Sequence, residues 1–285
     1  MKFKQIMSSV LVLCMCLMMQ GCKADSLEQQ DQKEPVVQQE QKPVKEEANK
    51  QEETKKTLTN FIQTAMQPVG QTMYIWGGGW NEEDTGSGPD TRRIGMPERW
   101  KEFYLAQNNG YNFQTTQYQI HDGLDCSGYI GWILYNVFET EDDKPGYVSL
   151  SGDMPDDFVS RGWGKKISRG NIQDYQCGDI LANENHVFLV LGQCEDGSLL
   201  IVHSAPPGVR LCGTPTPDYN LQSEAVLLAE SLMLEHHPDW LEKYPEASAE
   251  YSYLVDYDQF RWNDTLKDVD HLRDKSAEEI ATYLF

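Results

Sequence analysis

The sequence predicts an α+β fold in which helices come first and an antiparallel sheet follows. An apolar helical face begins after Cys126, because the next apolar residues recur at intervals of three and four: Ile130, Ile133, Leu134, Val137 and Phe138. Two apolar runs, at residues 186–191 and 199–204, flank the turn dipeptide Asp196-Gly197. Helices and strands that occupy separate stretches of chain favour α+β over an alternating α/β order.

Residues 1–21 predict a secretory signal peptide rather than a folded element. Lys2 and Lys4 precede a short apolar run at 7–19, and Gly21 precedes Cys22. A cysteine directly after glycine resembles the end of a bacterial lipoprotein signal. That resemblance implies that Cys22 is lipidated and that the protein is held outside the cytoplasm on the bacterial cell membrane. Met19 stands where such signals prefer leucine, so an ordinary signal peptide with incidental cysteines is the alternative.

A disordered tether is expected over residues 22–56. This stretch is rich in Gln, Glu, Lys and Pro and has no aromatic residue, so it cannot bury enough apolar surface to fold. A flexible charged segment after a lipid anchor would let the folded part reach away from the membrane.

The formal net charge of −21 comes from the remaining residues 57–285, because the first 56 residues carry as many lysines as acidic residues. A strongly acidic domain is a poor partner for a polyanion, so nucleic acid is excluded as the expected ligand. Charge would not hold the domain on an anionic wall polymer either, which leaves attachment to the anchor.

Three helices are expected before the strands. Apolar spacing predicts the first over 58–66 and the second over 97–107, and the third runs from Cys126 to Glu139 with Asp125 as its N-cap. Three consecutive glycines at 77–79 can turn tightly or lie close to a ligand. Residues 81–122 lie between these glycines and the helix that begins at Cys126, and they are polar and contain several glycines; this segment is called the insertion.

Four strands are expected after the third helix. They lie at 179–182, 186–191, 199–204 and 209–212. Residues 57–218 therefore predict one domain that contains the insertion. Residues 219–285 predict a mainly helical extension packed on it, with helical spacing from Leu221 to Leu232 and a capping box at Ser276–Glu279.

The cysteines do not predict a metal centre. No two of them are spaced as C-x-x-C, so a structural zinc site is poorly supported and neither a metal nor a cofactor is expected. Cys194 and Cys212 are compatible with two arrangements. They either face each other across neighbouring strands or remain two buried thiols.

Cys126 is the candidate nucleophile. In the first turn of a helix, the free backbone N–H groups and the helix dipole stabilise negative charge, which predicts a lowered thiol pKa. A cysteine nucleophile also needs a base within hydrogen-bonding reach. His186 and His203 lie on the two arms of the hairpin and could meet side by side, although a structural histidine bonded to backbone is the alternative for each.

Four segments in fixed order resemble the NlpC-type cell-wall peptidases, a papain-like family of bacterial cysteine hydrolases. They are Tyr74-Ile75-Trp76-Gly77-Gly78, Asp125-Cys126-Ser127-Gly128, Gly178-Asp179-Ile180 leading to His186-Val187, and Val202-His203-Ser204. The resemblance covers residues 57–213. It implies a papain-like core in which the nucleophile helix packs on an antiparallel sheet.

The resemblance also implies the roles of individual residues. Cys126 would be the nucleophile, His186 the base and His203 the residue that orients the base. Tyr74, Asp125 and Ser127 would line the site that holds the free amino end of the substrate, and Trp76 is assigned to substrate binding with them. Two departures stand out. The family joins its first two motifs by a short loop in place of the 81–122 insertion, and the glycine usual after His-Val is replaced by Phe188.

The implied function is a peptidoglycan hydrolase. It would cleave an amide bond in wall stem peptides through an acyl-enzyme, at the bond between D-γ-glutamate and the diamino acid. Two alternatives remain: an amidase that cuts between muramic acid and L-alanine, and an inactive wall-binding lipoprotein. A third alternative is that the insertion and the C-terminal helices bind a protein partner. The sequence does not identify that partner.

Overall fold

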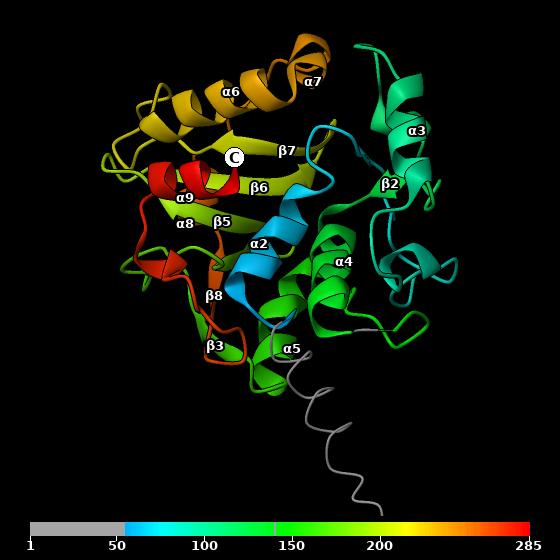
Figure 1. Ribbon diagram of the computed structural model, residues 1–285, viewed down its shortest axis with the longest axis horizontal. Helices are drawn as coiled ribbons and strands as arrows, with labels where there is room; N and C mark the ends of the chain where they lie inside the picture. The colour runs from blue at the N-terminus through cyan, green and yellow to red at the C-terminus, as the bar shows by residue number, and fades with distance from the viewer. Residues whose placement is uncertain (1–54, 140) are drawn as a thin grey trace, which may run out of the picture. The chain divides into compact units, whose positions relative to one another are not determined.

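The computed structural model describes residues 55–139 and 141–285. The predicted signal peptide, the lipidation site Cys22 and the tether as far as residue 54 lie outside the described residues. Within the described part, no helix combines the length and the apolar character needed to cross a membrane. The predicted α+β class is confirmed, with helices packed on one mixed sheet of eight strands (Figure 1).

The strands follow the order β2-β1-β7-β6-β5-β4-β8-β3 in the sheet. Their bounds are β1 (Met73–Tyr74), β2 (Gly123–Leu124), β3 (Gly164–Ile167), β4 (Ile180–Ala182), β5 (Val187–Gln193), β6 (Leu199–Ala205), β7 (Gly208–Gly213) and β8 (Asp258–Trp262). All neighbours pair antiparallel except β1 and β2, which pair parallel. The expected wholly antiparallel sheet is therefore corrected at this edge, where two short strands precede the two glycine-bearing motifs.

The four predicted strands are confirmed as β4 to β7. The β5–β6 hairpin turns at Asp196-Gly197, where Gly197 adopts a φ of 84° that glycine tolerates best. Almost every residue of these two strands is buried. Burial on both faces explains why their sequences read as continuous apolar runs rather than as alternating patterns.

The helices of the described residues include all those predicted from the sequence. Their bounds are α2 (Leu58–Met66), α3 (Glu98–Ala106), α4 (Cys126–Phe138), α5 (Met154–Ser160), α6 (Glu224–His236), α7 (Pro238–Lys243), α8 (Ser252–Val255) and α9 (Ala277–Leu284). The capping box at Ser276 and Glu279 is present at the start of α9. In Figure 1, α2 lies beside α4, and α6 runs along β7.

The C-terminal segment is not an appendage on a completed domain. Its strand β8 lies between β4 and β3 and pairs with both of them. Polar and apolar residues alternate at 259–262, which fits a strand, but four residues are the shortest length at which this pattern predicts one. Phe260 packs in the core, while Gln259 and Arg261 bond to the buried Asp179.

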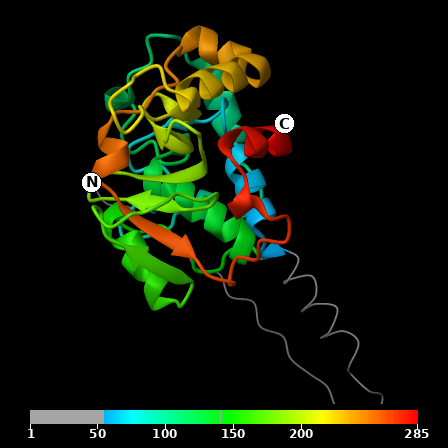
Figure 2. The ribbon, with the colours of Figure 1, turned by 90° about the vertical axis from the view of Figure 1, so that its left-hand side faces the viewer.

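Two apolar clusters lie on opposite faces of the sheet. The larger one contains residues of α2, α4, α6 and α9. The smaller one contains Phe188, Ile201 and Cys212, and Tyr253 of α8 packs against it. Figure 2 shows this division, with α2 and α9 on one side of the strands and α8 on the other. The C-terminal segment thus contributes to the cover of both faces.

Candidate active site

Cys126 begins α4 next to the glycine-rich loop. Asp125 is the N-cap, and its Oδ1 atom accepts a hydrogen bond of 2.6 Å from the backbone N–H of Gly128. Gly128 allows the loop to lie close to the first helical turn, since a Cβ atom there would lie 2.1 Å from the carbonyl oxygen of Gly78. The predicted cap is confirmed, and the predicted tight turn of the glycines is present, with Gly77 and Gly79 at φ of 81° and 92°.

His186 and His203 lie side by side. His186 immediately precedes β5 and His203 lies within β6, and the Nε2 atom of His186 is 3.2 Å from the Nδ1 atom of His203. The two rings meet edge to face, with their centroids 5.3 Å apart. The hairpin predicted from Asp196-Gly197 brings them together, because its two arms pair antiparallel.

The Cys126 thiol faces the first residue of β5. The backbone N–H of Val187, the residue after His186, donates a hydrogen bond to the thiol. No side-chain hydrogen bond joins Cys126 to His186 in the described part of the chain. Since His186 directs Nε2 at His203, its Nδ1 atom is the nitrogen left for a second partner.

Burial decides the ionisation of the cysteine and the histidine. Burial raises the pKa of Cys126 to about 12, and the neighbouring carboxylate of Asp125 adds to the shift. The expectation of a lowered thiol pKa is therefore wrong, because desolvation outweighs the hydrogen bonds donated by the backbone of Val187 and Ser127. Burial lowers the pKa of His186 to about 3, with a smaller contribution from Arg210. At neutral pH Cys126 is therefore an uncharged thiol and His186 a neutral imidazole.

Asp125 and Ser127 are both engaged in local contacts. The Ser127 hydroxyl donates to Asp125 Oδ1 at 2.9 Å and accepts from the indole N–H of Trp80 at 3.0 Å. Burial raises the pKa of Asp125 to about 6, while the hydrogen bonds from Gly128 and Ser127 oppose the rise. Trp80 was not predicted to have a role here. Its hydrogen bond ties the residue that precedes the insertion to the first turn of α4.

Tyr74 is buried at the edge of the site, whereas Trp76 is half exposed. Burial raises the pKa of Tyr74 well above its ordinary value, and the Cys126 thiol contributes to the shift. The Tyr74 ring meets Phe113 of the insertion edge to face, with centroids 5.5 Å apart. Its carbonyl accepts a hydrogen bond of 2.6 Å from the hydroxyl of Tyr111.

The insertion and the C-terminal segment together form a cleft beside Tyr74. The cleft has a volume of about 380 Å³. Its walls come from the insertion, the β6–β7 turn and the chain after α7, through residues such as Tyr111, Phe113, Pro207, Lys243 and Tyr244. The 81–122 insertion therefore lines this cleft, but none of the predicted site residues is part of its wall.

Two tyrosines of the C-terminal segment belong to the site and carry no signal in the sequence. Tyr253 and Tyr257 both interact electrostatically with the Cys126 thiol, and the Tyr253 ring lies 5.5 Å from that of His186. No local motif marks them, because each reaches the site through the sheet pairing of β8.

Cys212 is expected from the sequence to be either a buried thiol or a partner of Cys194 across neighbouring strands. It is free, and its Sγ atom lies 3.4 Å from Nε2 of His203.

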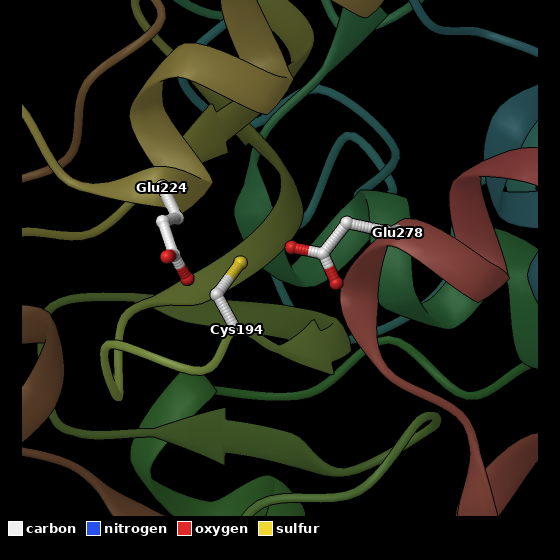
Figure 3. A group of neighbouring side chains, drawn as sticks. All are labelled: Cys194, Glu224 and Glu278. Carbon is white, nitrogen blue, oxygen red and sulfur yellow. The ribbon is translucent and has the colours of Figure 1, made fainter.

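A second group of side chains lies away from this site, around the β5–β6 turn. Cys194, Glu224 and Glu278 bring one thiol and two carboxylates within 4.8 Å of one another (Figure 3). Burial raises the pKa of Cys194 to about 12, and the neighbouring Glu278 carboxylate adds to the rise. Glu224 already accepts a hydrogen bond from the backbone N–H of Asp196 at 3.1 Å. The group therefore ties α6 and α9 to the hairpin.

Comparison with protein-family models, with curated proteins and with solved structures finds no match for this chain.

Proposed function

We propose that the protein is a cysteine peptidase with a papain-like core. One observation carries the proposal. The Cys126 thiol, in the first turn of a buried helix, accepts a hydrogen bond from the backbone N–H of Val187, and the preceding residue, His186, is hydrogen-bonded to His203. The three side chains are separated by 60 and 17 positions in the chain. This is the set of groups that nucleophilic acyl transfer requires: a nucleophile, a base and a group that orients the base.

We propose peptidoglycan stem peptides as the substrate and the bond between D-γ-glutamate and the diamino acid as the point of cleavage. The support is the ordered resemblance of four segments to NlpC-type peptidases, together with the lipoprotein-like sequence that ends at Cys22. The same sequence supports a location outside the cytoplasm, on the membrane. Tyr74, Trp76, Asp125 and Ser127 are the proposed substrate-binding residues.

In the proposed reaction the Cys126 sulfur attacks the amide carbonyl carbon. His186 takes the thiol proton on Nδ1 as the carbon–sulfur bond forms, and then gives it to the leaving amine. The backbone N–H groups at the start of α4 would stabilise the oxyanion. Water, activated by His186, then hydrolyses the thioester and releases the acid. His203 holds His186 in the required tautomer through the 3.2 Å contact.

The ionisation of the pair predicts an unusual pH profile. His186 must be neutral to act as a base, and its pKa of about 3 keeps it neutral at pH 5. A base with the ordinary histidine pKa of about 6.5 would lose about 30-fold between pH 8 and pH 5. Neither Cys126 nor His186 titrates between pH 5 and pH 8, but Asp125, whose pKa burial raises to about 6, does. We therefore expect kcat/KM of the Asp125→Asn variant at pH 5 to stay within about twofold of its own value at pH 8.

The control for this profile is the folded fraction at each pH. His186 and His203 are neutral in the fold and bind protons when unfolded, so they lower the stability as the pH falls below about 6.5. Circular dichroism at pH 5 and pH 8 should therefore accompany each rate. An acid limb near pH 6.5 in fully folded Asp125→Asn protein would contradict the ionisation assigned to His186.

Mass spectrometry of the products tests the proposed bond. We expect the purified full chain to release a fragment that ends in D-glutamate from soluble muropeptides, and the Cys126→Ala variant to release none. A new L-alanine amino end on a sugar-free peptide would instead identify the amidase. Binding of muropeptides without any product, in both proteins, would favour the inactive wall-binding lipoprotein.

A further inference from the structure

The third residue of the proposed triad has more partners than a triad requires. His203 Nδ1 lies 3.2 Å from His186 Nε2 and 3.4 Å from the hydroxyl of Tyr253, and His203 Nε2 lies 3.4 Å from the sulfur of Cys212. His203 is 2% exposed, so these contacts, rather than bulk water, determine which ring nitrogen carries the proton. A role for these contacts in catalysis rests on the proposed function, since they belong to the same site.

The proposed reaction requires one particular tautomer of His203. His186 can accept the thiol proton on Nδ1 only if its own proton is on Nε2, directed at His203. His203 Nδ1 must then be bare and act as the acceptor, which puts the His203 proton on Nε2, facing Cys212. The opposite tautomer of His203 would donate from Nδ1 to His186 and would force a proton onto the His186 atom that should act as the base.

Tyr253 approaches the nitrogen that must stay bare. The Tyr253 hydroxyl lies within hydrogen-bonding distance of His203 Nδ1, and burial raises the Tyr253 pKa well above its ordinary value, so the hydroxyl keeps its proton. A protonated hydroxyl next to Nδ1 favours the bare nitrogen, because it can then donate its hydrogen bond. The sulfur of Cys212 offers an acceptor on the other side of the ring.

The position of Tyr253 is held by several contacts. Its ring stacks on Phe188, with centroids 4.8 Å apart and planes 29° apart. The carbonyl of the next residue, Leu254, accepts a hydrogen bond of 3.2 Å from the hydroxyl of Tyr175. Phe188 is the residue that replaces the glycine usual in NlpC-type peptidases, and here it provides the surface on which Tyr253 packs. A side chain held in this way is suited to orient a partner.

We propose that Tyr253 is a positioning residue, which keeps His203 in the Nε2–H tautomer and thereby keeps His186 ready to accept the thiol proton. Cys212 supports the same tautomer from the opposite side of the ring. The C-terminal segment would then be required for catalysis through the Tyr253 hydroxyl. Among the described residues this hydroxyl has no hydrogen bond to Cys126.

The test uses the full chain labelled with 15N in histidine, with the His203→Asn variant to assign the His203 resonances. We expect the wild type to show a bare Nδ1 and a protonated Nε2 at His203, and the Tyr253→Phe variant to show a mixture of the two tautomers. In the same variant we expect kcat to fall about tenfold with KM unchanged, as when a partner that orients a histidine is lost.

Tyr251→Phe is the matched control. It removes a hydroxyl from the same segment, one that donates to the carbonyl of Pro217 at 3.1 Å, and it should leave both the tautomer and kcat unchanged. A proton on His203 Nδ1 in the wild type would overturn the proposal without any variant. So would a Tyr253→Phe variant with the wild-type tautomer and rate. The tautomer is read without substrate, so a failure of the proposed function remains distinguishable from a failure of this inference.

Discussion

Replacing Cys126 by alanine is expected to lower kcat by at least about 10⁴-fold, because members of a catalytic triad act as a unit and the loss of the nucleophile removes the covalent pathway. The remaining donors and binding contacts cannot form an acyl-enzyme without the sulfur. Single-turnover kinetics with a soluble muropeptide would measure the loss, and trapping of the thioester in the wild type would identify the intermediate.

Cys177→Ala is the matched control for this prediction. Cys177 is also a free, buried thiol, but its charged neighbours include Asp268 and Arg273, which do not belong to the proposed site. Its removal should leave kcat unchanged. Comparable activity of Cys126→Ala and the wild type would refute the assignment of the nucleophile, provided that the thermal transitions of the three proteins coincide.

Replacing Arg261 by methionine is expected to destabilise the fold by about 3–5 kcal/mol, because it leaves a buried carboxylate without its counter-charge. The side chain of Asp179 is 2% exposed. Arg261 binds it through two nitrogens, Nε to Oδ1 at 3.0 Å and Nη2 to Oδ2 at 2.7 Å. Burial raises the pKa of Asp179 even with this pairing, which indicates how costly the unpaired carboxylate would be.

Urea unfolding measures this effect, with two variants for comparison. Lys144→Met breaks an exposed ion pair with Glu141 and should cost no more than about 1 kcal/mol. Adding Asp179→Asn to Arg261→Met should recover part of the lost stability, because the unpaired charge is then removed. A loss below about 1 kcal/mol in Arg261→Met would mean that β8 is not an integral part of the sheet, contrary to its pairing with β4 and β3.

The sequence predicted the elements whose signals are local. The Asp125 cap and the apolar spacing after Cys126 predicted α4, and Asp196-Gly197 predicted the hairpin that brings His186 beside His203. Each of these signals acts within a few residues, through a hydrogen bond to the next turn or through the geometry of a tight turn. For this reason the proposed nucleophile and both histidines could be chosen before the fold was known.

Other parts of the site depend on contacts between distant residues. Ile180 pairs with Phe260, which is 80 positions later, and this pairing brings the C-terminal segment into the sheet. No propensity of either short strand specifies that partner, because the pairing depends on which apolar side chains can be buried together. Tyr253 reaches His203 as a consequence of this pairing. The local pattern of residues 219–285 does not show the pairing, so by itself it indicates only a separate extension.

The sequence by itself determined the identity and order of the reactive groups, together with the local turns that present them. Only the tertiary structure decided their ionisation and their neighbours. The pKa of Cys126 shows the physical reason. The helix N-terminus, which would lower the thiol pKa, is formed by a few adjacent residues. The desolvation that raises this pKa to about 12 depends on every segment packed around the thiol. Local hydrogen bonds can be inferred from the sequence, but exclusion of water is a property of the whole fold.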